Sequence, residues 1–190
     1  MKRKDVCIYC NESANTKDHV PPRCFLDEPY PLNMTTVPAC SQCNESFSKD
    51  EQYIMYLSDY LFSIEYNDGD FSREKAELTF AYNDKLEDRM IDSLKVVDNL
   101  GVYFNFEYER IIFIIRKISV GLLFLVFGNT KRVEVSNFIP NTHLSFQQKE
   151  ELENIKWIVV QENRFKYFIS DTVIYFIINE VLLCLSKYGE

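Results

Sequence analysis

Hydrophobic residues first recur at helical spacing in residues 48–63, on one face made by Ile54, Leu57 and Leu61. Ser48, followed by Glu51 three residues later, has the pattern of a capping box, which predicts that this helix begins at Ser48. A second amphipathic pattern in residues 84–101 predicts another helix, ended by Gly101.

The longest apolar run covers residues 111–127 and carries Arg116 and Lys117 near its middle. A membrane span needs about 20 apolar residues and rarely tolerates two central cations. The run therefore predicts a buried helix that ends near Gly128, and no membrane span. Residues 102–109 alternate weakly, which fits either a strand or the lead-in to that helix.

The C-terminal part is rich in β-branched and aromatic residues, in three strand-like runs at 156–162, 164–170 and 172–185. Together with the helices, these runs predict that residues 64–190 form an α+β domain with a small antiparallel sheet. A hydrophobic share of 46%, with 15 Phe and 12 Tyr, is enough for a packed core and excludes a disordered chain.

Residues 1–49 differ from the rest, because they hold five of the six cysteines and none of the five glycines. The start, "MKRKDVC", has no apolar segment like that of a signal peptide, which predicts a cytoplasmic protein. In that reducing compartment, clustered cysteines indicate metal or thiol chemistry in place of disulfides.

Two pairs of cysteines, Cys7 with Cys10 and Cys40 with Cys43, each have two residues between the thiols. Two such knuckles predict a four-cysteine Zn²⁺ site, which is closed and therefore structural. The alternatives are two unrelated reduced pairs, or a redox couple, which would need only one pair. Cys184 lies in an apolar run and is expected in the core, while Cys24 is left unassigned.

Asp18 and His19 lie between the two knuckles, and Asn44 directly follows the fourth cysteine. A zinc ion that joins the knuckles would fold the loop with Asp18 and His19 back beside Asn44. Asp18 and Asn44 offer the oxygen ligands that Mg²⁺ or Mn²⁺ prefers, and a neutral imidazole can take a proton from water.

The segments "CIYC", "KDHVPP" and "VPACSQCNESFSKDE", in that order, resemble the HNH endonucleases of the ββα-metal superfamily, in the branch with a four-cysteine zinc site. The resemblance covers roughly residues 5–63. It implies a zinc-stapled, treble-clef-like ββα-metal module in residues 1–63, followed by the α+β domain as an accessory unit for specificity, dimerisation or partner docking.

The resemblance also implies roles for individual residues. His19 matches the general base, while Asp18 and Asn44 match the ligands of a catalytic Mg²⁺ or Mn²⁺ ion. Thr35 stands where the family usually has an asparagine that braces the histidine loop, and Asn33 is a nearby substitute. The implied activity is hydrolysis of phosphodiester bonds in DNA, within a bacterial or phage defence or restriction system.

Charge bears on this function, because the net charge is −8 and residues 1–49 are balanced, with six basic and six acidic residues. The acidic excess therefore lies in residues 50–190, where it would repel DNA and favours docking of a protein partner that delivers or activates. The cations nearest to the predicted site are Lys17, Arg23 and Lys49. A rival hypothesis is a zinc module without catalysis that binds nucleic acid or protein.

Overall fold

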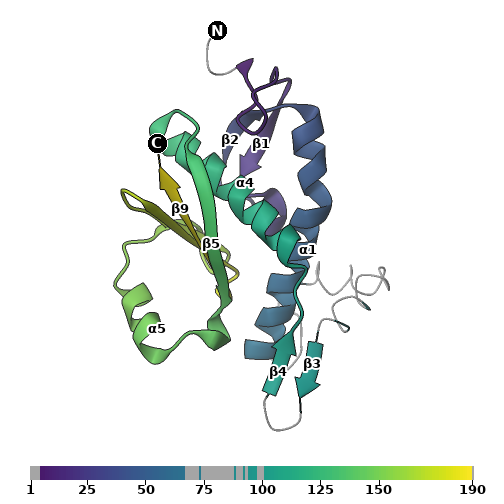
Figure 1. Cartoon of the computed structure of the whole chain (residues 1–190), viewed down its shortest axis with the longest axis vertical. Coiled ribbons are helices and arrows are strands. Elements are labelled where there is room, and N and C mark those ends of the chain that lie inside the picture. The colour runs from purple at the N-terminus through teal and green to yellow at the C-terminus, as the bar shows by residue number, and fades with distance from the viewer. Residues whose placement is uncertain are drawn as a thin grey trace.

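The computed structural model of the chain describes residues 5–66, 73, 88, 92, 94–97 and 101–189. Those residues form an α+β fold, as predicted, with antiparallel strands throughout (Figure 1). Within the described residues, the helices of eight residues or more are α1 (Ser41–Tyr66), α4 (Tyr108–Phe127) and α5 (Phe146–Glu153).

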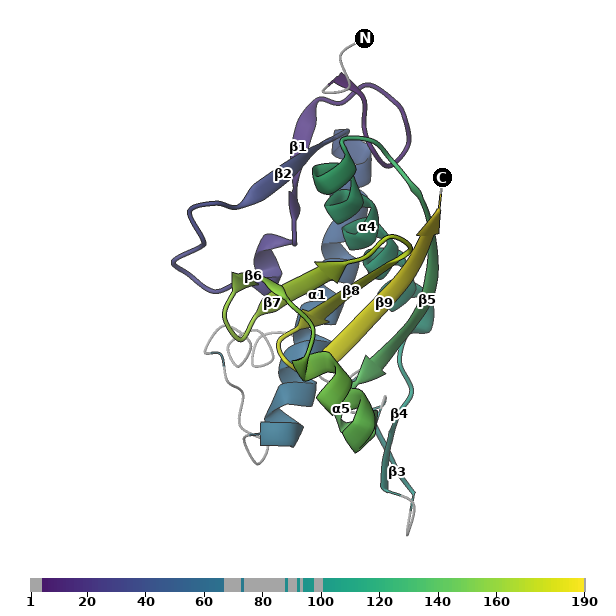
Figure 2. The same cartoon turned by 90° about the vertical axis from the view of Figure 1, so that its left-hand side faces the viewer.

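The C-terminal sheet has the strand order β5-β9-β8-β7-β6 (Figure 2). The predicted strand runs are confirmed in β6 (Ile158–Gln161), β7 (Phe165–Ile169), β8 (Val173–Ile178) and β9 (Leu182–Gly189). The last run divides into two strands because Asn179 and Glu180 turn the chain with positive φ angles of 53° and 60°. The sequence pattern missed both α5 and the edge strand β5 (Arg132–Pro140).

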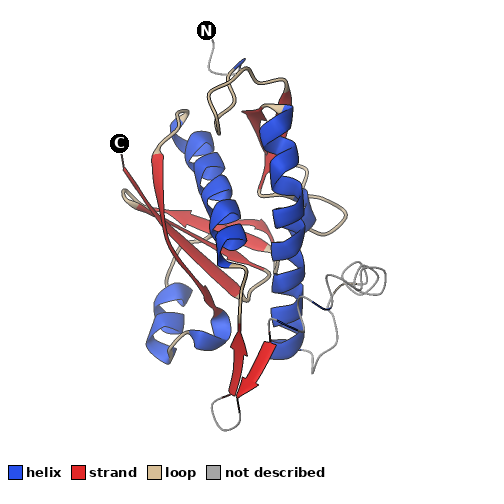
Figure 3. Ribbon diagram, turned by 45° about the vertical axis from the view of Figure 1, so that its right-hand side comes forward, coloured by secondary structure: helices blue, strands red, loops and turns tan. Residues whose placement is uncertain are grey.

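Helix α4 lies between α1 and the sheet (Figures 1 and 3), which confirms the predicted buried helix. It ends at Gly128, whose φ of 67° is the left-handed conformation that glycine adopts readily. It also approaches the N-terminal hairpin closely, since a Cβ atom on Gly121 would lie 2.5 Å from Cγ2 of Val20. Among the described residues, no helix combines the length and apolar character that crossing a membrane requires.

The N-terminal part is an antiparallel hairpin of β1 (Thr16–Val20) and β2 (Thr35–Ala39), followed directly by α1. The prediction that this helix begins at Ser48 is wrong, because α1 begins seven residues earlier, at Ser41. Its first turn is capped from a distance: Asn15 Oδ1 accepts a hydrogen bond from the Ser41 N–H at 2.8 Å. Glu51 therefore has no capping role and contacts Lys117 instead.

The predicted helix at residues 84–101 is confirmed at the described residues Asp88 and Asp92, which are helical, but the prediction is wrong at its C-terminal end. Leu94–Val97 form strand β3, which pairs with β4 (Gly101–Phe104), so the strand reading of residues 102–104 is confirmed. Val96 and Val97 are β-branched, which favours a strand over a helix. Most of the remaining residues of that prediction lie outside the described part of the chain.

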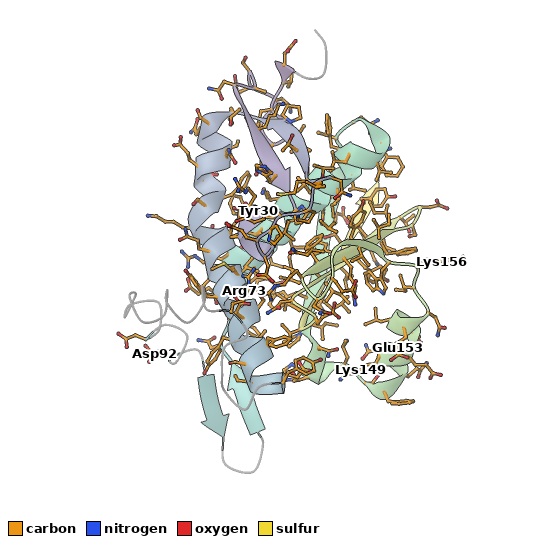
Figure 4. All side chains as sticks on the ribbon, turned by 180° about the vertical axis from the view of Figure 1, so that it is seen from behind. Tyr30, Arg73, Asp92, Lys149, Glu153 and Lys156 are labelled. Carbon is orange, nitrogen blue, oxygen red and sulfur yellow. The ribbon has the colours of Figure 1, made fainter. Side chains whose placement is uncertain are left out.

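A buried ion network joins α1 to the C-terminal sheet. Asp59 of α1 is 1% exposed, and its carboxylate accepts from Arg73 at 3.2 Å and from the Asn179 amide at 3.0 Å. Arg164, which precedes β7, contacts both Asp59 and Asp27. Figure 4 shows Arg73 beside α1. The predicted domain boundary at residues 63–64 falls within the last turn of α1 and stays a prediction.

Because two arginines converge on Asp59, we expect Asp59→Asn to lower the free energy of unfolding by about 2 kcal/mol. Urea unfolding followed by circular dichroism measures this change. Glu45→Gln is the matched control, since it removes the same charge from an exposed position of the same helix. Equal stability of the two variants would contradict a structural role for the network.

Candidate metal centre and Asp-His site

The four cysteines of the two knuckles come together at the N-terminal end of α1. Their Sγ atoms all lie within 4.8 Å of one another, and those of Cys10 and Cys40 are 3.7 Å apart. The edge of a tetrahedron with metal–sulfur bonds of about 2.3 Å measures about 3.8 Å. The cluster could therefore hold a metal ion such as zinc.

Backbone N–H groups make hydrogen bonds within each knuckle. The Cys43 N–H donates to Cys40 Sγ at 3.4 Å, and the Asn11 N–H closes the first knuckle on the Cys7 carbonyl at 3.0 Å. Burial tends to raise the pKa of the Cys7 thiol, but hydrogen bonds from backbone N–H groups outweigh it and lower that pKa to about 7. A thiolate at Cys7 is thus accessible near neutral pH, as metal binding requires.

Asp18 is buried on β1, and both of its carboxylate oxygens are engaged. Lys117 Nζ contacts Oδ1 at 2.9 Å and Oδ2 at 2.8 Å, while the Tyr9 hydroxyl donates to Oδ2 at 2.6 Å. Burial and the neighbouring Asp18 charge both raise the pKa of Tyr9, which therefore stays a protonated donor. Asp18 is consequently held from two sides by this chain's own donors.

Lys117 reaches the site from α4, and its side chain is 0% exposed. Besides Asp18, its ammonium group donates to Glu51 Oε1 at 2.7 Å and contacts the His19 carbonyl oxygen at 3.3 Å. Lys117 Nζ also lies over the Phe47 ring, 5.4 Å from the ring centre. Burial raises the pKa of Glu51, and the Lys117 charge opposes that increase.

His19 lies beside Asp18 on β1 and is half-buried. Burial, followed by the positive charge of Arg23, lowers its pKa below 6.5, while Asp18 acts in the opposite direction. At neutral pH the imidazole is therefore uncharged and has a nitrogen that can accept a proton.

Thr35 braces the end of the strand that carries His19. Thr35 Oγ1 donates at 2.7 Å to the carbonyl of Val20, the residue that follows His19. Thr35 and Val20 are also paired in the register of the hairpin. The hydroxyl group is the one side-chain donor that a threonine has, and this bond uses it to hold the end of the strand.

The other predicted residues differ in their burial. Asn44 is half-buried in the first turn of α1, where its backbone N–H donates to the Cys40 carbonyl at 3.0 Å. Lys17 and Lys49 are exposed, and the Arg23 guanidinium stacks 4.4 Å from the Tyr30 ring centre. Cys184 is fully buried in the sheet, as expected.

Sequence reasoning missed three residues of the site: Tyr9, Glu51 and Lys117. Tyr9 lies inside a cysteine knuckle and gave no signal, and Glu51 was assigned to a helix cap because of its spacing from Ser48. Lys117 did carry a signal. A lysine in the middle of an apolar helix is almost never fully buried unless a counter-charge faces it, and such a residue predicts a buried carboxylate on another element.

No protein-family model, curated protein or solved structure matches this chain.

Proposed function

We propose that the hairpin and the start of α1 form an HNH-type endonuclease module that hydrolyses phosphodiester bonds. The observation that supports it most is the meeting of four cysteine thiols at the point where the β1–β2 hairpin leads into α1. That junction brings the strand with Asp18 and His19 alongside the helix with Asn44 and Glu51.

His19 is the proposed general base. Its lowered pKa leaves the imidazole neutral at pH 7, so it can take a proton from the water that attacks phosphorus. The bond from phosphorus to the 3′-oxygen then breaks, giving a 5′-phosphate and a 3′-hydroxyl that is protonated from solvent. Lys17, Arg23 and Lys49 are the proposed contacts to phosphate oxygens.

The catalytic Mg²⁺ or Mn²⁺ ion that the HNH resemblance implies does not fit Asp18 in its observed setting. Its two oxygens already accept three contacts, from Lys117 and Tyr9, and the nearby Glu51 also binds Lys117. This arrangement favours a second candidate function, a zinc module without catalysis that binds nucleic acid or a protein partner.

A plasmid-nicking assay separates the two candidates. With Mg²⁺, Mn²⁺ or Ni²⁺ present, we expect His19→Ala to lower the cleavage rate by about 10²- to 10⁴-fold, the usual contribution of a general base. His143→Ala is the matched control, because His143 is the other histidine and is exposed after β5. Equal cleavage by wild type and His19→Ala would contradict the catalytic role, and DNA binding without cleavage by any form would favour the second candidate.

A further inference from the structure

The buried ammonium group of Lys117 contacts Asp18, the carboxylate that the HNH resemblance expects to hold a divalent cation. We propose that Lys117 is the permanent counter-ion of Asp18 and Glu51, so that the native chain binds no Mg²⁺ or Mn²⁺ at this carboxylate pair. This inference refines the proposed function, because it names the Lys117 ammonium group as the cation of the site. Its relevance to cleavage rests on that proposed function.

The coordination of the ammonium group supports this assignment. Three N–H bonds point to three acceptor groups: the Asp18 carboxylate, Glu51 Oε1 and the His19 carbonyl. A protonated lysine has three donors, so its hydrogen-bonding capacity matches the acceptors around it. These acceptors are all oxygens, which are also the ligands of hard divalent cations.

The surrounding packing fixes the ammonium group in place. Lys117 belongs to a helix whose neighbouring residues Ile114, Ile115 and Ile118 are almost fully buried. The Phe47 ring covers Nζ, and Phe47 itself is packed edge-on against Tyr9, with ring centres 4.9 Å apart. Withdrawal of Lys117 would leave two carboxylates facing each other in a space that these rings shield from water.

The net charge of the cluster also disfavours a divalent cation. Two carboxylates and one ammonium group leave the cluster with one net negative charge, whereas two carboxylates alone would carry two. A divalent cation gains most from two free carboxylates, and it competes poorly with a fixed ammonium already inside their coordination shell. Lys117 therefore lowers the affinity of the pair for divalent cations while keeping Asp18 in position beside His19. It acts as a positioning residue, since it is too buried to touch a substrate.

Binding of Mn²⁺ tests the proposal without any cleavage assay. The loss of the free-Mn²⁺ signal in electron paramagnetic resonance reports binding, and Mn²⁺ prefers oxygen ligands, so it leaves a zinc-loaded cysteine cluster untouched. We expect wild type, Asp18→Asn and Asn44→Ala to bind Mn²⁺ equally weakly. A wild-type site that is lost in Asp18→Asn would overturn the proposal, whether or not the protein cleaves DNA.

Removing the ammonium group should create the site that it now excludes. We expect Lys117→Ala to bind one Mn²⁺ ion at least about tenfold more tightly than wild type, and the added change Asp18→Asn to abolish this gain. Arg116→Ala is the control, because Arg116 is the exposed neighbour on the same helix. A folded Lys117→Ala protein that gains no Mn²⁺ site would contradict the proposal. If that variant does not fold, the comparison of wild type with Asp18→Asn decides alone.

Discussion

Replacing Cys40 with serine should abolish tight zinc binding and unfold the N-terminal hairpin. The cysteine cluster joins the segment of residues 7–10 to the start of α1, beside the bond from the Ile8 N–H to the Pro38 carbonyl and the bond from Tyr9 to Asp18. Structural zinc contributes about 10–16 kcal/mol of binding free energy in small zinc modules, because the unfolded chain has no preformed site. The loss of one ligand should therefore exceed the effect of any single substitution in the core.

Two measurements check this result. Elemental analysis should give one zinc per wild-type chain and none per Cys40→Ser chain, and amide hydrogen exchange should show protection lost across β1 and β2. Cys24→Ser is the matched control, since Cys24 lies outside the cluster and should keep both zinc and protection. A Cys40→Ser protein with undiminished protection would show that the hairpin folds without metal.

The effect should reach beyond the hairpin. Val20 of β1 packs against Gly121 of α4, and Lys117 of the same helix binds Asp18. A hairpin that unfolds takes Asp18 away from Lys117 and leaves that ammonium group buried without its main counter-charge. We therefore link the metal cluster to the stability of α4, although the two are far apart in the sequence.

Local spacing explains what the sequence could predict. The two knuckles were visible because a metal site fixes the separation of its ligands, and β8 was visible because β-branched and aromatic residues follow one another there. The apolar run at residues 111–127 predicted a helix with a buried face, which its composition alone indicates. These features depend on neighbours in the chain, so a single sequence contains them.

The features that the sequence did not predict depend on contacts between distant residues. The start of α1 is set by Asn15, which lies 26 positions before Ser41, and no local pattern marks that bond. Glu51 has the spacing of a cap, yet it binds Lys117, 66 positions away. Asp18 is a third case: its position between the two knuckles fits a metal ligand, but in the fold the ammonium group of Lys117 contacts it. In each case a tertiary partner replaces the local one.

Replacing Lys117 with methionine should lower the free energy of unfolding by about 3–5 kcal/mol at neutral pH, because it leaves two carboxylates without their counter-charge. Methionine keeps most of the volume of the side chain, so the loss reports charge more than packing. Urea unfolding measures the change, and Arg116→Met, on the exposed face of the same helix, is the control. Equal stability of these two variants would contradict a structural role for the ion cluster.

The pH dependence of this loss separates charge from packing. Burial already raises the pKa of Glu51, and Lys117 is what opposes the increase. Without Lys117 the folded state should bind protons at Glu51 more tightly than the unfolded state, so the contribution of this carboxyl group to the variant's stability is greatest below about pH 4, where it is protonated in both states. That contribution should then fall as pH rises through the raised pKa. The deficit relative to wild type should therefore be small in acid and grow toward pH 7, and the triple variant Asp18→Asn, Glu51→Gln, Lys117→Met should recover much of it. A deficit that stays constant with pH would instead indicate a packing defect.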